Sequence, residues 1–346
     1  MPGRVAFGSR RKGKPMQLQE TLRGRWPAGG LSTRARRWWS HGDRLFSGLT
    51  ILAGLLVVAV VVGIGYELWT SSSLSRHAFG PGFVLSSRWD PAIDQAFGAL
   101  PFLLGTLTVS AIAMLLAVPV GIGVGIFLGE LAPSWLAQPV GFVVELLAAV
   151  PSVIFGLWGL FAFVPGAVRP LAEALQHGLG FLPVFAGPVF GPSRLAAGLL
   201  LAIMVLPIIS ALSRDVFRAI PAAQREAALA LGATRWEMIS QVLIPYGRSG
   251  LLGVAILGLG RALGETIAVT MVIGNNLDLT ASLLHPGYTM ASIIANEFTE
   301  ATYDLYLQSL IEIALILFFL TLIINLIARY LVWRVARRGP QEELRA

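Results

Sequence analysis

Long apolar stretches alternate with short polar segments along this chain of 346 residues. A helix needs about 20 apolar residues to cross a bilayer, because each residue advances it by about 1.5 Å. By this criterion the pattern predicts an all-α membrane protein with six transmembrane helices. We expect the spans at residues 45–66, in the later part of 94–130, and at 140–163, 195–213, 249–273 and 307–328.

Prolines and one carboxylate modify two of these spans. The stretch 94–130 is too long for one crossing, so its start near Pro101 is expected to form an external lead-in helix. Pro119 is expected to kink the span itself, and Pro151 to break the third span. Glu145, near the start of the third span, is expected at the cytoplasmic surface of the membrane rather than at a gate.

The balance of charge supports this interpretation and indicates an orientation. Of all residues 55% are hydrophobic and 13% are charged, a composition typical of membrane proteins. Eleven Lys and Arg residues precede Leu45, and five lie in each of the segments 214–248 and 329–346, whereas the remaining polar segments carry four. The positive-inside rule therefore places both termini and segment 214–248 in the cytoplasm. Segments 70–96, 166–193 and 274–304 are expected outside.

The basic tail 1–44 is rich in Arg, Gly and Pro and is predicted to be disordered, with a role in fixing topology and touching anionic lipid. Residues 8–14 imitate a phosphate-binding loop, but Pro15 stands where Ser or Thr would hold Mg²⁺. We therefore favour neither nucleotide nor nucleic-acid binding by this tail. A short cytoplasmic tail is also expected at 339–346, which leaves one transmembrane domain at 45–338.

No catalytic or metal centre is predicted. The chain has no Cys, and its four His residues show no ligand spacing. No nucleophile–base pair or pair of carboxylates stands out either. We expect that the chain is not an enzyme and binds no metal or cofactor itself, so any driven transport must take its energy from a partner or from an ion gradient.

A polar, Ala-rich segment between the fourth and fifth spans is predicted to form a helical elbow, which we define as residues 221–245. Pro221 is expected at the first helical position, where its missing N–H is harmless. Gly232 suits the left-handed position that ends a helix. Thr234 and Glu237 have the spacing of a capping box that starts a second short helix, and Pro245 is expected to close it.

One face of the first elbow helix is flat, because Ala223, Ala227 and Ala230 share it. A flat, water-exposed helical face suits a docking surface better than a catalytic site. The alternative interpretation is an ordinary loop helix that lies on the membrane surface.

Two charged residues, Arg261 and Glu265, fall midway along the fifth span, where charges are costly and are functional candidates. Their i,i+4 spacing would place both on one helical face, where they can form an ion pair. The pair suits either an anion pathway or a structural role that fixes helix register, and the sequence favours neither. Glu312 is expected at the outer membrane surface, and Asn275 and Asn276 are expected to cap the end of the fifth span.

The elbow resembles the EAA loop of ATP-binding-cassette (ABC) importer permeases, in which E-A-A, three residues, G and nine residues precede I-x-L-P. Val242 and Ile244 replace the usual Ile and Leu conservatively. A second stretch, Gly258–Thr266, reads Gly-Leu-Gly-Arg-Ala-Leu-Gly-Glu-Thr and is similar to the PstC family of phosphate-importer permeases. The positions that match the EAA pattern are Glu226, Ala227, Ala228, Gly232 and Pro245.

The resemblance implies a MetI-like fold, phosphate import and a location in the bacterial plasma (inner) membrane. It implies a heterodimer with a PstA-like permease, a PstB-like ATPase dimer that docks on the elbows, and an external PstS-like phosphate-binding protein. ATP and Mg would be used by the ATPase rather than by this chain. Arg261 and Glu265 would line the substrate pathway, and the five EAA positions would couple the permease to the ATPase.

Two alternatives stay open. A membrane-embedded Arg does not choose between tetrahedral anions, so another oxyanion such as sulfate or molybdate is possible. An ion-coupled secondary transporter with Glu265 as the coupling acid is the alternative from a different class. Such carriers tend to show inverted repeats, no convincing repeat is visible here, and the elbow would then have no purpose.

Overall fold

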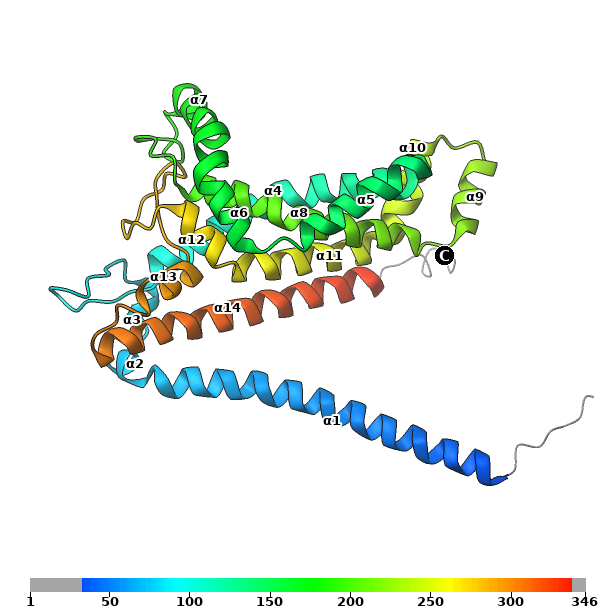
Figure 1. Cartoon of the computed structure of the whole chain (residues 1–346), viewed down its shortest axis with the longest axis horizontal. Coiled ribbons are helices and arrows are strands. Elements are labelled where there is room, and N and C mark those ends of the chain that lie inside the picture. The colour runs from blue at the N-terminus through cyan, green and yellow to red at the C-terminus, as the bar shows by residue number, and fades with distance from the viewer. Residues whose placement is uncertain (1–32, 338–346) are drawn as a thin grey trace, which may run out of the picture. The chain divides into compact units, whose positions relative to one another are not determined.

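The computed structural model describes the backbone of residues 33–337 and the side chains of residues 45–334. Residues 1–32 of the predicted tail 1–44, and the whole predicted tail 339–346, lie outside the described residues. The regular structure of the described chain is helical (Figure 1). The α-helices are α1 (Thr33–Ser71), α2 (Ser73–Phe79), α3 (Gly82–Leu85), α4 (Leu100–Ile126), α5 (Ser134–Ala148), α6 (Ser152–Trp158), α7 (Arg169–Leu179), α8 (Arg194–Arg218), α9 (Ala222–Ala230), α10 (Arg235–Glu237), α11 (Ile244–Gly264), α12 (Ile267–Ile273), α13 (Met290–Glu297) and α14 (Asp304–Arg337), with π-helical segments at Phe127–Leu131, Gly159–Val168 and Met238–Leu243.

Six helical segments of the described chain are long and apolar enough to cross a membrane, which confirms the expected all-α architecture. They are Leu45–Ser71, Leu100–Leu131, Ser152–Leu179, Arg194–Arg218, Arg235–Gly264 and Asp304–Arg334.

The chain divides into two compact units at Val62. The first unit contains most of α1, whose apolar side chains from Leu45 to Val62 are exposed. Its helix begins at Thr33, within the segment that the sequence assigns to the tail 1–44. The second unit begins at Gly63 and contains the elbow and the other five spans.

The third span differs from the prediction of 140–163, because Pro151 divides that stretch between two helices. Helix α5 ends at Ala148 and is too short to cross alone, and the span proper runs from Ser152 to Leu179. Proline lacks an N–H and disfavours helical geometry in the residue before it, so the helix must stop there. Pro165 lies further along the same span within a π-helical segment.

The second span also differs from its prediction. No separate lead-in helix forms at Pro101, which instead lies in the first turn of α4, where no N–H is needed. Pro119 lies inside α4, and a π-helical turn carries the span on to Leu131.

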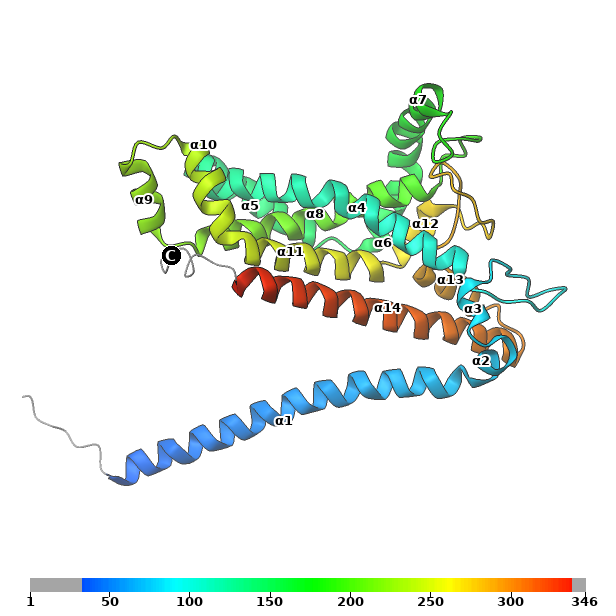
Figure 2. The ribbon, with the colours of Figure 1, turned by 180° about the vertical axis from the view of Figure 1, so that it is seen from behind.

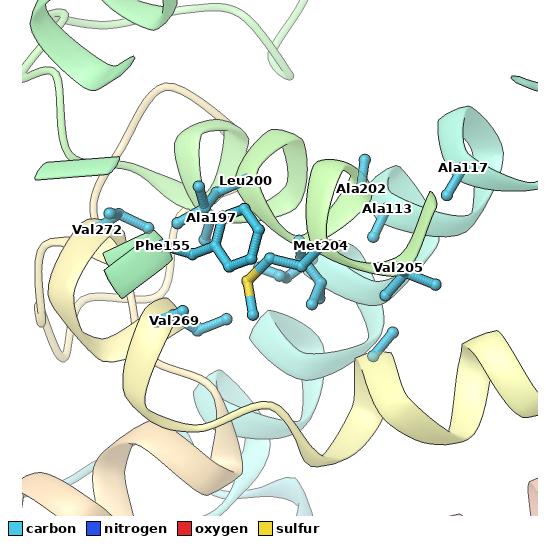
Figure 3. Packing of buried hydrophobic residues seen from close by; sticks show 14 of the residues in the cluster. Ala113, Ala117, Phe155, Ala197, Leu200, Ala202, Met204, Val205, Val269 and Val272 are labelled. Carbon is cyan, nitrogen blue, oxygen red and sulfur yellow. The ribbon is translucent and has the colours of Figure 1, made fainter. Parts of the chain in front are cut away.

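Helices α4 and α8 pack along much of their length and carry the main core, together with α6, α11 and α12. Phe155 from α6, Met204 and Val205 from α8, and Val269 and Val272 from α12 meet in this cluster (Figure 3). The two short helices α6 and α12 contact each other directly. Figures 1 and 2 show the elbow helices α9 and α10 at one end of this unit and α7, α12 and α13 at the other.

Glycines on one face of α4 allow the close approach of α8. A Cβ atom at Gly121 would lie 2.7 Å from Ile209 Cγ2, and one at Gly125 would lie 2.6 Å from Ser213 Cβ and 3.0 Å from the backbone nitrogen of Arg214. Gly123, between them, faces open space.

We expect Gly125→Ala to destabilise the protein by about 1–3 kcal/mol, because a methyl group there must displace the backbone of α8. Gly123→Ala is the matched control, and it should be neutral or slightly stabilising because Ala favours helix. Thermal unfolding of the two variants in detergent is the measurement. Equal melting temperatures would show that α4 and α8 do not pack as described.

The end of this unit opposite to the elbow contains two buried carboxylates. Glu297 of α13 accepts hydrogen bonds from Trp89 Nε1 and Tyr306 Oη, both at 2.7 Å. Burial raises the pKa of its carboxyl group above the usual value. Glu312 of α14 is 5% exposed and accepts a hydrogen bond from Ser75 Oγ, so it joins α2 to α14.

Candidate functional site: the elbow and the membrane arginine

The local geometry of the elbow follows the sequence closely. Pro221 differs by one position from the prediction, because it precedes the first helical residue, Ala222, and has ψ of 138°. Gly232 adopts the expected left-handed conformation with φ of 88°. Thr234 and Glu237 form the expected capping box: the Glu237 N–H donates to Thr234 Oγ1 at 3.3 Å, and the Thr234 N–H donates to Glu237 Oε2 at 2.8 Å. These bonds satisfy N–H groups that the start of a helix leaves unpaired.

The prediction that Pro245 closes the second elbow helix is wrong. Helix α10 continues through the π-helical segment Met238–Leu243 into α11. Pro245 lies in the first turn of α11, directly after the widened π-helical turns. Backbone N–H groups in the first turn of a helix have no partner within that helix, so the N–H that proline lacks is not missed there. The elbow is therefore joined to the fifth span by unbroken helix.

The EAA positions divide into exposed and buried ones. Glu226 and Ala227 are exposed, as are Ala223 and Ala230 on the flat face. Ala228 is 7% exposed and belongs to the buried cluster beneath the elbow. Ala228 thus supports the elbow from inside, whereas Glu226 and Ala227 are available to a partner. The other buried members of that cluster are Phe217, Ile220, Met238, Ile239, Leu243 and Leu251.

Two large apolar side chains next to the EAA positions project from the elbow. Leu231 is 90% exposed and Trp236 is 68% exposed. Exposed apolar groups on an otherwise polar elbow are typical of an interaction site. Neither residue is among those predicted from the sequence, although their positions beside the turn at Gly232 could have indicated them.

An ion pair that the sequence did not predict fixes the elbow to the rest of the unit. Arg225 Nη2 lies 2.6 Å from Glu130 Oε1, and Arg225 Nε lies 3.0 Å from Glu130 Oε2. The same guanidinium donates to the backbone carbonyl of Phe217 in the last turn of α8 and to that of Ile220, just beyond this helix, both at 2.6 Å. The hydrogen bonds to Glu130 raise the pKa of Arg225 above its usual value. A second pair joins Arg214 of α8 to Glu145 of α5 at 2.6 Å, which places Glu145 near the elbow end of the unit.

The expected helical pairing of Arg261 with Glu265 does not occur. Helix α11 ends at Gly264, and Glu265 has an extended backbone with ψ of 126°. The two residues therefore fall at the end of the helix rather than in the middle of a continuous one. Within the described residues, neither side chain forms an ion pair or hydrogen bond.

Arg261 lies on an open face of α11. Its side chain is exposed, and a Cβ atom at Gly253, Gly260 or Gly264 would meet no atom of this chain. Gly258 is different, because a Cβ there would lie 2.9 Å from Ile209 Cδ1. Only Gly258 of these four glycines therefore serves helix packing within the described chain.

The fifth span ends at Gly264, earlier than the predicted 273, and the cap predicted for it closes α12 instead. Gly274 is left-handed with φ of 90°, and Asn275 Nδ2 donates to the carbonyl of Thr270 at 3.1 Å. Asn276 takes no part in this cap, because its Oδ1 accepts from the Asp278 N–H at 2.9 Å. No group of three His, Cys, Asp or Glu side chains able to hold a metal ion occurs in the described part of the chain.

Comparison with known proteins defines the class to which this fold and elbow belong. Residues 121–337 match the family described as "Binding-protein-dependent transport system inner membrane component". Among solved structures, the chain is similar in fold to a bacterial alginate ABC transporter (TM-score 0.57, 16% identity, 88% of this chain and 99% of that one). It is also similar to the MetNI methionine ABC transporter (TM-score 0.51, 18% identity, 67% and 93%). The chain is thus a multi-pass membrane subunit of an ABC transporter with a MetI-like fold.

Similar sequences narrow the class. The chain is 46% identical to a "Phosphate transport system permease protein PstC" of Mesorhizobium japonicum over 86% of this chain and 92% of that protein. It is 43% identical to the protein of the same name in Haemophilus influenzae, over 88% and 98%. It is 42% identical to "Phosphate transport system permease protein PstC 2" of Mycobacterium tuberculosis, over 84% and 91%. The chain belongs to the PstC family of transport system permeases.

Proposed function

We propose that this chain is the permease subunit of an ATP-driven importer that moves inorganic phosphate into the cell. Family membership supports the transport role, and the names of the relatives support phosphate as the substrate. The structural observation that carries the proposal is Arg261, a cation with an exposed side chain on a membrane-spanning helix.

The unfavourable free energy of a charge in lipid explains why the exposed Arg261 side chain indicates a transport pathway. A charged side chain in contact with hydrocarbon is unfavourable by several kcal/mol, so such residues face a partner or a water-filled cavity. The face of α11 with Arg261 and the open glycines is therefore turned to a second permease subunit or to an aqueous pathway. A guanidinium there offsets part of the hydration that a phosphate anion loses. Glu265, at the helix break, is proposed as the second polar residue of this pathway.

The elbow is proposed as the docking site of the ATPase. Glu226, Ala227, Leu231 and Trp236 present a mixed flat and apolar surface of the kind that partner subunits bury. The continuous helix from α10 into α11 then connects the docking site with the segment that carries Arg261. A PstA-like permease, a PstB-like ATPase dimer that uses ATP and Mg, and a PstS-like phosphate-binding protein complete the proposed transporter.

Competition between anions during uptake tests whether phosphate is the substrate. We expect proteoliposomes with the complete transporter and its external binding protein to accumulate radiolabelled phosphate, with no competition from excess sulfate or molybdate. Omission of the binding protein is the control for leakage. Equal competition by sulfate, or uptake of molybdate in place of phosphate, would assign a different oxyanion.

The proposed orientation places both termini and the elbow in the cytoplasm, in the bacterial inner membrane. Single Cys residues can report it, because the chain has none of its own. Thr299 and Gln224 are both exposed and lie on the outer and the cytoplasmic side in this orientation. An impermeant maleimide should label Thr299→Cys in spheroplasts but Gln224→Cys only after lysis. The opposite labelling pattern would reverse the orientation.

A further inference from the structure

The Glu130–Arg225 pair joins three elements that meet beneath the elbow. Glu130 lies in the π-helical turn Phe127–Leu131 that ends the second span, and Arg225 lies in α9. The Phe217 carbonyl, which also accepts from Arg225, lies in the last turn of the fourth span, and the Ile220 carbonyl, a further acceptor, lies just beyond it. One guanidinium thus binds the elbow to two spans at once.

The pair is shielded, which distinguishes it from an ordinary surface ion pair. The side chain of Glu130 is 7% exposed and that of Arg225 is 21% exposed. Surface pairs contribute little because water and salt screen them, whereas a shielded, forked guanidinium–carboxylate pair is both strong and directional. The surface pair Arg169–Glu173 in α7, with side chains 62% and 48% exposed, lies within one helix and can hold no two elements together.

We propose that Glu130 is a positioning residue for energy coupling: its ion pair with Arg225 makes the elbow and the end of the second span move together. This inference rests on the proposed ATP-driven function. Any displacement of the elbow by a docked ATPase then reaches α4 through Glu130, in addition to α8 through the two carbonyls and α11 through unbroken helix. Because α4 packs along α8 in the main core, this second path moves the core as one body.

The test uses the complete transporter in proteoliposomes and compares two Glu→Gln variants. Glu130→Gln keeps the shape of the side chain but removes its charge, and Glu173→Gln is the matched control. Three quantities are measured: phosphate taken up, ATP hydrolysed, and ATPase retained on purification. We expect Glu130→Gln to lower the ratio of phosphate to ATP by about tenfold, with the ATPase retained. Glu173→Gln should leave the ratio unchanged.

Each result has a distinct meaning. A normal ratio in Glu130→Gln, beside a wild-type transporter that imports phosphate with ATP, overturns the inference and leaves the proposed function intact. Loss of the ATPase from Glu130→Gln also overturns it, because Glu130 would then only support the docking surface. A wild-type transporter without ATP-driven phosphate uptake overturns the proposed function itself. If Glu130→Gln does not assemble, Glu130→Asp serves instead, since it retains the charge on a shorter side chain and should give an intermediate ratio.

Discussion

Phosphate uptake should fall by about 10- to 100-fold when Arg261 is replaced by Gln, while the transporter still assembles. Loss of one hydrogen bond to a charged group is worth about 1.5–3 kcal/mol, which corresponds to roughly that change in rate. Assembly should survive because the Arg261 side chain is exposed and makes no ion pair within the described chain. Uptake normalised to purified complex is the measurement.

Three further variants separate a pathway role from a structural one. Arg261→Lys should retain part of the uptake, because it keeps the charge but loses the planar fork. Arg334→Gln, which removes an exposed arginine near the end of α14, is the matched control and should transport normally. A structural pair with Glu265 would instead predict that the double variant Arg261→Gln/Glu265→Gln recovers transport. Full phosphate uptake by that double variant would remove Arg261 from the mechanism.

The second large effect is expected at the elbow, where Glu226→Lys and Leu231→Asp should each release the ATPase and abolish transport. Both side chains are exposed, so neither change disturbs the core of the permease. A central interface residue contributes about 2 kcal/mol or more, which weakens binding by roughly 30-fold. Co-purification of the ATPase with the membrane-inserted variants is the measurement.

Controls for the elbow come from the same chain. Glu300→Lys makes the same charge reversal at an exposed position on the opposite end of the unit, and it should retain the ATPase. A Cβ atom at Gly232 would meet no atom within 4 Å, so the effect of Gly232→Ala must come from the left-handed backbone, which disfavours a side chain by about 1–2 kcal/mol. Normal ATPase retention in Glu226→Lys and Leu231→Asp would show that the docking surface lies elsewhere.

The turn and the capping box of the elbow could be predicted from the sequence, because the residues that shape them act within a few positions of one another. Gly232 needs only its own backbone conformation, and Thr234 reaches a partner three residues on at Glu237. The same locality explains the correct prediction of the cap at Asn275. The end of the elbow at Pro245 was predicted wrongly, because proline suits the first turn of a helix as well as a helix end. Apolar content likewise predicted the number of candidate spans, since that number depends on the length of each run.

Helix breaks inside apolar stretches were harder to place. Pro151 was expected to break the third span, but hydrophobicity continues across it, so the pattern did not show that the crossing begins only at Ser152 and extends to Leu179. The break after Gly264 has no proline at all, and the i,i+4 spacing of Arg261 and Glu265 did not show that the helix ends there. Gly264 stands at this position, but a glycine in a sequence can either allow close helix packing, as Gly258 does, or end a helix.

Ion pairs between residues far apart in the chain could not be predicted from the sequence. Glu130 and Arg225 are 95 positions apart, and nothing in either local pattern links them. Their meeting depends on how the ends of α4 and α8 pack and on the π-helical turn at Phe127–Leu131. Local rules predicted the surface that a partner would meet, whereas the connection from that surface to the spans required the fold.

ATP-driven import is tested most directly by phosphate uptake into proteoliposomes with and without the ATPase subunits. The permease pair and the binding protein should take up no phosphate alone, even with a proton or sodium gradient imposed. Addition of the ATPase and ATP should start accumulation, and a non-hydrolysable ATP analogue should not sustain it. Gradient-driven phosphate uptake in the absence of the ATPase would contradict ATP-driven import and make this chain a secondary transporter.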